Sequence, residues 1–488
     1  MKLGMFFHLY QPAYQRKHIV DAVTAESYFP LSKMLLKQNS GKITMNVTGS
    51  LFEMWDKFGH KETLENYRKL AESNKVEFTA SVKFHAFLPF LTRDQILRQI
   101  DQNNITLKKY LGENIKLNGF FPPEMAVNTE IIDLVQSLGY KWIIIDEIAH
   151  SGHIDTIKNN VLYQDTNSEL KLLFRNRRVS NLIMSGVARE SKTVQSATAD
   201  TPSNSYTVTG MDGETFGHHR PGLIEMLEEL ISEKNFEYKT LSEISELDFP
   251  TEKVSVVSST WASSSNDIEK GIQFLSWNDP TNEIHKLQKE LNDLTCELVY
   301  KFAMEDEKTN AMLDKALASD HYWWASGKPW WSVEMIEEGA HLLIEVINTI
   351  PNLDNAQILK ANEIYRRIVA NAFEWQRTGK IDEMQENYGD KQRIPFKDRT
   401  ADKEWEYRAF VELMEQLELE AAKKKEYEMA VLWRNAIYKL ENKLDVFDSM
   451  NAIDLLRTKL PHKKIEDLIE KYKMEYKKIR SGQPEQRD

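Results

Sequence analysis

The chain has 488 residues, a formal net charge of -12 and a single cysteine, Cys296. The negative charge argues against binding to nucleic acid or to an anionic membrane face, and every apolar run is shorter than the roughly 20 residues that span a bilayer. Because one cysteine cannot form an internal disulfide and the first residues lack a basic leader with an apolar core, we expect a cytoplasmic protein.

The first half of the chain alternates short apolar runs with amphipathic segments. Several runs are continuously apolar, which is typical of strands buried on both faces of a parallel sheet. The segments between them, such as 25–38 and 130–140, have apolar residues at helical spacing. This alternation predicts a closed or nearly closed β/α barrel. The expected strands cover residues 2–10, 42–50, 75–82, 117–122, 141–147, 170–176, 181–185, 205–213 and 253–259.

Chemically capable side chains stand at or just beyond the ends of most of these strands. In β/α barrels the loops at the carboxyl ends of the strands build the active site. Polar residues also accumulate wherever strands stop, which explains any one of these residues equally well. Seven together indicate a site: His8, His85, Glu124, Asp146, Arg175, Asp212 and Trp261.

Two of these residues are acids whose backbone is constrained. Glu124 follows Pro122 and Pro123, which end the strand sharply and hold the next residue. A negative charge at the start of the following helix would also stabilise that helix by roughly 0.3–1 kcal/mol, which explains Glu124 without a catalytic role. Asp212 ends a strand where nearby glycines let the backbone turn.

Two carboxylates on neighbouring strand ends suggest glycoside hydrolysis, in which one is the nucleophile and the other the general acid and base. Glu214 would supply the negative charge that keeps Asp212 protonated. Donors such as Arg175 or His8 would keep the nucleophile ionised.

Five segments resemble the motifs of glycoside hydrolase family 57, the retaining α-glucan enzymes that include α-amylases and 4-α-glucanotransferases. The resemblance covers roughly residues 1–290 and implies an α/β fold, an incomplete (β/α)7-type barrel followed by a C-terminal α-helical domain. It also implies that Glu124 is the nucleophile and Asp212 the general acid/base. The segments are "HLYQP" (8–12), "FHAFLPFL" (84–91), "GFFPPEMAVN" (119–128), "MDGETFGHH" (211–219) and "SSTWASSSND" (258–267).

The same resemblance implies a set of substrate contacts. Tyr10 stands where a second histidine is often found, which changes one sugar-facing position. No cofactor and no metal are expected. The predicted substrate-binding residues are His8, Gln11, His85, Asp146, Arg175, Glu214, His218, Trp261 and Trp324.

From about residue 283 the pattern changes to helices, so the chain is divided into a barrel (1–282), a helical domain packed on the barrel (283–380) and a C-terminal helical extension (381–488). A loop over 382–400 is expected between the last two. Four tryptophans lie within 320–332, where their rings either stack on sugar rings or bury where helix meets barrel.

The sequence therefore predicts a retaining hydrolase or transglycosylase of α-1,4-linked glucans, whose partner is an oligo- or polysaccharide; a homo-oligomer stays open. A metal-dependent carbohydrate enzyme of the deacetylase or α-mannosidase type is the nearest rival, although the adjacent His218 and His219 tend to point apart. A non-catalytic glycan-binding barrel is the third alternative.

Overall fold

The computed structural model describes residues 1–38, 41–73, 75–199, 201–202, 204–328, 330–388, 404–442, 452–453, 455–456, 459–460 and 462–480. These residues divide into two compact units, one formed by 1–215 and 226–381 and the other by 216–225 and 382–488. In the described part of the chain, no helix is long and apolar enough to cross a membrane. The domain boundaries predicted from the sequence stay a prediction.

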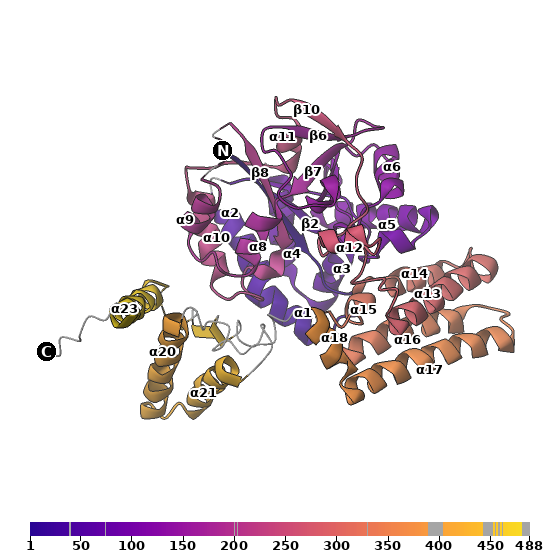
Figure 1. The fold of residues 1–488 in the computed structure, drawn as a ribbon. Helices are drawn as coiled ribbons and strands as arrows, with labels where there is room; N and C mark the ends of the chain where they lie inside the picture. Colours follow the sequence, from indigo (N-terminus) through magenta and orange to yellow (C-terminus); the bar gives the residue numbers. More distant parts are fainter. Residues whose placement is uncertain are drawn as a thin grey trace. The chain divides into compact units, whose positions relative to one another are not determined.

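Parallel strands form the centre of the first unit and are surrounded by helices (Figure 1). Five of the neighbouring pairs are parallel ladders: β8 with β1, β1 with β2, β2 with β3, β4 with β5, and β5 with β7. The strands are β1 (Lys2–Leu9), β2 (Ile43–Val47), β3 (Val76–Phe78), β4 (Gly119–Phe120), β5 (Trp142–Asp146), β7 (Lys171–Arg175) and β8 (Tyr206–Asp212).

Two single contacts join the ladders into a barrel. Ala80 bridges Phe120 in parallel, which links β3 to β4. The amide of Asn176 donates to Val208 at 2.7 Å, which links β7 to β8. The predicted incomplete (β/α)7-type barrel is therefore confirmed, and continuous burial along β2 and β5 agrees with strands covered on both faces.

Three short strands lie outside this ring. β9 (Glu237–Lys239) adds to the amino half of β1, while β6 (Leu162–Asp165) pairs antiparallel with β7 and parallel with β10 (Thr251–Val254). The prediction missed β6 and β9. The expected strand at 181–185 is wrong, because these residues fall in or next to α8 (Arg177–Met184). Asn176 caps that helix, and Val179 and Ile183 share its buried face. Five residues are too few to distinguish this helical spacing from the alternation of a strand.

Helices and single turns connect the strands of the first half of the chain. They are α1 (Lys17–Val23), η1 (Thr24–Tyr28), α2 (Phe29–Lys37), α3 (Gly49–Phe58), α4 (Lys61–Glu72), η2 (Leu88–Phe90), α5 (Arg93–Leu111), η3 (Pro123–Met125), α6 (Thr129–Ser137), α7 (Ile148–Ser151), α9 (Ser191–Ala197), η4 (Gly213–Thr215), α10 (Leu223–Ser232), α11 (Leu241–Ser245) and α12 (Ser265–Glu269).

A layer of longer helices stacks beside the barrel within the first unit (Figure 1). Asn282 caps the first of these, and Asp354 caps the longest through a reciprocal bond with Gln357. Arg98 of α5 and the buried Asp314 form an ion pair at 2.6 Å that ties this layer to the barrel. The helices are α13 (Glu283–Phe302), α14 (Glu307–Ala316), α15 (Asp320–Trp323), α16 (Val333–Thr349) and α17 (Asn355–Thr378).

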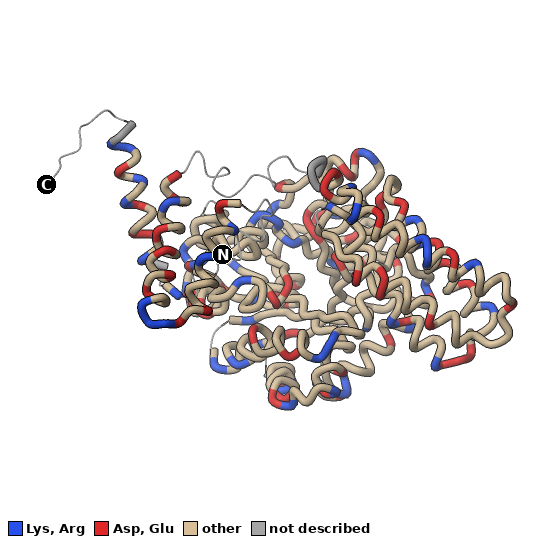
Figure 2. The backbone as a smooth tube through the Cα atoms, turned by 90° about the horizontal axis from the view of Figure 1, so that it is seen from below, with Lys and Arg blue, Asp and Glu red and all other residues tan. Residues whose placement is uncertain are grey.

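The second unit contains helices with a core of their own. Phe410, Leu413 and Trp433 are buried with Leu456 and Ile465 in one cluster. Acidic and basic residues are mixed along the backbone in Figure 2. The expected loop over 382–400 is wrong for 382–388, because α18 (Lys380–Tyr388) covers them, and 389–400 lie outside the described residues. The helices of this part are α20 (Glu404–Lys423), α21 (Tyr427–Asn442) and α23 (His462–Arg480).

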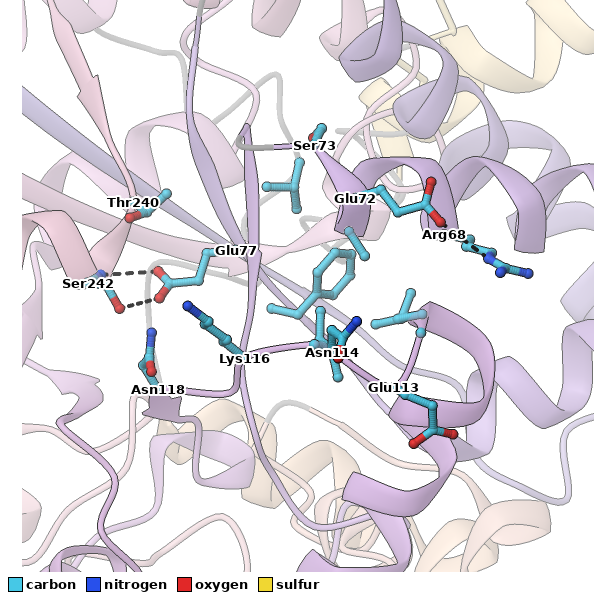
Figure 3. Close-up of a pocket in the computed structure, with 16 residues that line it drawn as sticks. Arg68, Glu72, Ser73, Glu77, Glu113, Asn114, Lys116, Asn118, Thr240 and Ser242 are labelled. Carbon is cyan, nitrogen blue, oxygen red and sulfur yellow. Dashed lines mark hydrogen bonds and ion pairs between the residues drawn. The ribbon is translucent and has the colours of Figure 1, made fainter.

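A groove of about 620 Å³ lies at the amino ends of β3 and β4 (Figure 3). Glu77 lines it and accepts hydrogen bonds from the amide and hydroxyl of Ser242. In β/α barrels this end of the strands serves stability, while chemistry is built at the opposite end. The site is therefore sought at the carboxyl ends.

Candidate active site

Glu124 is held in a strained conformation directly after β4. Its φ is 60° and that of Met125 is 48°, both in the left-handed region. A non-glycine residue there costs of the order of 1–3 kcal/mol, and such strain persists where the surroundings over-determine the backbone. The surroundings do so here: Met125 donates to Pro122 at 2.8 Å, and the Trp261 amide donates to the Glu124 carbonyl at 3.1 Å.

The carboxylate of Glu124 is contacted from three sides. Trp261 Nε1 donates to Oε2 at 2.8 Å, His85 Nδ1 lies 3.8 Å from Oε1, and Ser319, whose Oγ bonds the same His85 Nδ1 at 3.0 Å, lies beside them. Burial and the charge of Asp212 raise the pKa of Glu124 to about 8, against the effect of the Trp261 and Ser319 bonds.

Asp212 ends β8 directly opposite His8 of β1 in the parallel ladder. Burial raises the pKa of Asp212 to about 6, while the charge of Arg175 acts in the opposite direction. A Cβ on the following Gly213 would lie 2.6 Å from Leu9 Cδ1, so the backbone passes too close to β1 for a larger residue. Asp212 and Glu124 lie on the same side of the barrel, since His8 pairs with Asp212 in the ladder, bonds His85 at 3.0 Å, and His85 lies 3.8 Å from Glu124.

Glu214 is buried beside Asp212 and accepts hydrogen bonds from Tyr28 Oη and, at 3.3 Å, from the Tyr10 amide. Burial and the charge of Asp212 raise the pKa of Glu214 to about 8. Because neighbouring carboxylates repel when both are ionised, this arrangement keeps protons on the site near neutral pH. Gln11 Nε2 donates to Tyr28 Oη at 3.3 Å and thus joins the same network.

Asp146 and Arg175 are both buried and face each other. Arg175 donates to Asp146 at 2.7 Å and, through Nε, to the Gly210 carbonyl at 2.6 Å. Arg177 donates to the other oxygen of Asp146 at 2.6 Å. The Arg175 guanidinium lies 5.9 Å from the centre of the Trp261 ring. These residues form a wall beside Asp212, and their predicted contact with substrate stays a prediction.

The sequence analysis missed Ser319 and Asp320, which come from the helical layer. Asp320 Oδ2 accepts a hydrogen bond from Tyr10 Oη at 2.6 Å, and its charge contributes to the raised pKa of Glu124. Burial raises the pKa of Asp320 to about 6. Asp320 is the first residue of the tryptophan-rich segment 320–332, and Ser319 directly precedes it. These polar residues at the start of the segment were the available signal.

The remaining predicted residues are distributed as follows. Trp324 is half-buried, and its amide donates to the Asp320 carbonyl at 2.9 Å, one turn from that carboxylate. Trp323 packs at 5.1 Å on Trp277, as the burial alternative predicts for the cluster. His218 belongs to the second unit, so its role at the site stays a prediction. Among the described residues, no group of three or more His, Cys, Asp or Glu side chains is arranged to hold a metal ion.

The sequence model of glycosyl hydrolase family 57 matches residues 5–258, which are 254 of the 488 residues. The chain belongs to glycosyl hydrolase family 57. The resemblance inferred from the five motifs is thus confirmed. No curated protein sequence matches the chain.

Solved structures are similar to this family 57 chain in fold. A 4-α-glucanotransferase from Thermococcus litoralis is 15% identical, with a TM-score of 0.56 over 71% of this chain and 59% of that chain. A branching enzyme of the family from Thermococcus kodakaraensis, solved with glucose, is 15% identical, with a TM-score of 0.55 over 76% of this chain and 96% of that chain. The chain thus spans less than two thirds of the glucanotransferase, and at this identity the likeness shows the fold alone.

Proposed function

We propose that the protein is a retaining glycoside hydrolase or transglycosylase that acts on α-1,4-linked glucans. The observation that carries this proposal is the pair of carboxylates at the carboxyl ends of β4 and β8, which interact electrostatically within one site. Membership of family 57 and the motifs around both acids support it.

In the proposed reaction Glu124 attacks the anomeric carbon while Asp212 donates its proton to the glycosidic oxygen. The bond from that carbon to the leaving sugar breaks, and a glycosyl ester forms on Glu124. Asp212, now ionised, then takes a proton from water or from a sugar hydroxyl, whose oxygen displaces Glu124. The product keeps the α configuration because the carbon is inverted twice.

The reacting form needs Glu124 ionised and Asp212 protonated. The pKa of Glu124 is about 8 and that of Asp212 about 6, so the pair holds one proton between about pH 6 and pH 8. Most of that proton lies on Glu124, and the reacting form, with the proton on Asp212, is the minor one. Trp261 and Ser319 lower the pKa of Glu124, because both side chains stabilise its ionised form. The proposal therefore assigns these two donors to keeping the nucleophile reactive.

Whether water or sugar accepts the glycosyl group depends on binding sites beyond the cleaved bond. We propose Gln11, Glu214, His218, Trp261 and Trp324 as substrate contacts, with Asp146 and Arg175 as the wall of the site. His8 and His85, whose ring nitrogens all bond protein atoms, are proposed to line the site behind Glu124. A cytoplasmic location is proposed on the single cysteine. The homo-oligomer stays a prediction.

Product analysis with maltoheptaose tests the proposal. Ladders of longer chains indicate transfer, and shorter maltooligosaccharides alone indicate hydrolysis. Glu124→Gln is expected to abolish turnover while retaining binding of maltoheptaose. Asp212→Asn is expected to lower it by roughly 100-fold or more, in line with the loss of general acid–base catalysis.

Glu77→Gln is the matched control, because Glu77 is a largely buried carboxylate at the opposite end of the barrel. It is expected to turn over like the parent. If the parent binds maltoheptaose but cleaves neither it nor other α-linked sugars, the protein is a glycan-binding barrel and the catalytic proposal is wrong.

A further inference from the structure

Two buried histidines connect the interior of the barrel to Glu124. His8 Nδ1 bonds Asn46 Oδ1 at 2.9 Å, and His8 Nε2 bonds His85 Nε2 at 3.0 Å. His85 Nδ1 bonds Ser319 Oγ at 3.0 Å. All four residues are at most 4% exposed, and each ring nitrogen has a protein partner. The chain of contacts ends beside Glu124, because His85 Nδ1 lies 3.8 Å from Glu124 Oε1 and the neighbouring Ser319 side chain lowers the pKa of that carboxyl.

Both rings are neutral near pH 7. Burial lowers the pKa of His8 to about 4 and that of His85 well below its ordinary value. A neutral imidazole has one N–H and one lone pair. In a row of hydrogen bonds through two such rings, every N–H therefore points the same way along the row, either toward Ser319 or toward Asn46.

Ser319 couples that direction to Glu124, because its hydroxyl has one hydrogen and two partners. When the hydroxyl donates to an ionised Glu124, His85 Nδ1 must donate to Ser319, and His8 Nε2 donates to His85. When Glu124 is protonated, its O–H donates to Ser319 and every bond reverses. As placed, Asn46 Oδ1 accepts from His8 Nδ1 and Asn46 Nδ2 donates to Thr79 at 3.2 Å, which fits the direction with protonated Glu124. The opposite direction requires the Asn46 amide to turn over, so that its N–H faces His8 and its oxygen accepts from the Thr79 hydroxyl.

We propose that Asn46, His8, His85 and Ser319 form a hydrogen-bond relay that aims the Ser319 hydroxyl at Glu124 and reverses when Glu124 gains or loses its proton. The relay rests on the proposed role of Glu124 as nucleophile. Its members are positioning residues, because they act through the Ser319 hydroxyl.

The backbone holds the relay in register. The Ser319 amide donates to the His85 carbonyl at 3.1 Å, and Ala86 bridges Ala318. His85 itself has a φ of 55°, a strained conformation for a non-glycine residue. Besides the relay, the groups that face Glu124 are the Trp261 donor and the charges of Asp212 and Asp320.

Ser319→Ala tests the relay in the full-length protein, with maltoheptaose as substrate and kcat and KM measured from about pH 5 to pH 9. Loss of one hydrogen bond to a charged group is expected to lower kcat/KM roughly tenfold and to move the alkaline limb up by about one pH unit. KM stays near the parent value. Ser319→Thr keeps the hydroxyl and restores the parent profile.

Ser326→Ala is the matched control, since it removes a buried hydroxyl from the same segment and leaves the relay intact. It is expected to keep the parent profile. An unchanged alkaline limb in Ser319→Ala, or the same shift in both variants, would overturn the relay.

His85→Gln separates the relay from direct sugar contact. Residues on one path are non-additive, so His85→Gln combined with Ser319→Ala is expected to lose little more than Ser319→Ala alone. If the losses in kcat/KM of the two single variants multiply in the double variant, and KM rises in every variant that lacks His85, then His85 binds sugar and the relay is refuted.

A labelling measurement keeps the relay testable if the parent leaves α-glucans unchanged, an outcome that overturns the proposed function alone. A carbodiimide reacts with protonated carboxyl groups, so the pH midpoint of labelling on the peptide that holds Glu124 reports its pKa. A midpoint about one unit higher in Ser319→Ala supports the relay, and equal midpoints refute it.

Discussion

Trp261→Phe removes one hydrogen bond from the proposed nucleophile while keeping an aromatic ring. Trp261 Nε1 donates to Glu124 Oε2 at 2.8 Å, and that bond lowers the pKa of the carboxyl. A hydrogen bond to a charged group contributes about 1.5–3 kcal/mol, and about 1.4 kcal/mol is tenfold in a rate or equilibrium. The expected fall in kcat/KM at neutral pH is therefore roughly 10- to 150-fold.

The pH profile provides a second, independent measure of the same loss. The parent is expected to show a bell with limbs near the pKa values of about 6 for Asp212 and about 8 for Glu124. Without the Trp261 donor the pKa of Glu124 rises further. Each further pKa unit on Glu124 lowers the fraction of the reacting form about tenfold and moves the alkaline limb up by about one pH unit. The fall in kcat/KM and the shift of the limb must therefore agree in size.

Trp277→Phe is the matched control. The Trp277 indole N–H is buried and has no hydrogen-bond partner among the described residues, so its removal breaks no bond. This variant is expected to keep the parent profile within about threefold. A fall in kcat/KM of Trp261→Phe without a shift of the alkaline limb, or an equal fall in both variants, would refute the role of the Trp261 donor.

Three further changes have measurable outcomes. Burial raises the pKa of Glu214 from 4.5 to about 8, so its effect on folding stability is fully present below about pH 4.5 and is lost as pH rises through about 8. Glu214→Gln should therefore stabilise the fold relative to the parent at about pH 9, by less than about 5 kcal/mol, and much less at about pH 5. The melting temperatures of both proteins at the two pH values measure this difference. Gly213→Ala forces a Cβ against the buried Leu9 and is expected to destabilise the fold by about 1–3 kcal/mol in urea unfolding. Tyr10→Phe removes the 2.6 Å hydrogen bond to Asp320, which should raise the pKa of that carboxyl. Because Asp320 then carries less negative charge near neutral pH, the pKa of Glu124 should fall, and the alkaline limb of kcat/KM in the maltoheptaose assay should move down by up to about one pH unit.

Each of these has a control. Glu246→Gln changes an exposed glutamate and should leave the melting temperature unaltered at both pH values; a gain for Glu214→Gln that is equal at the two values would contradict the linkage. Leu9→Val makes room for the new methyl and should recover part of the Gly213→Ala loss. An alkaline limb of Tyr10→Phe at the parent position would show that the charge of Asp320 does not act on Glu124.

Local signals in the sequence determined the barrel and both acids. Burial on both faces makes β5 almost continuously apolar, while β2 and β8 alternate apolar residues with Thr or Asn, so all three strands were readable from their own residues. The prolines before Glu124 and the glycines around Asp212 are likewise local, because they restrict or free the backbone at that point. The short strands β6 and β9 and the helix α8 were not readable, since three to eight residues carry too little periodicity to decide between a strand and a helix.

Only the tertiary structure decided what surrounds those acids. Ser319 meets His85 across 234 positions of the chain, and Asp320 meets Tyr10 across 310. No spacing rule in a sequence anticipates such pairs, because they depend on where the helical layer docks on the barrel. The raised pKa of Glu124 has the same origin, because burial and the like charges of Asp212 and Asp320 come from distant elements that packing brings together.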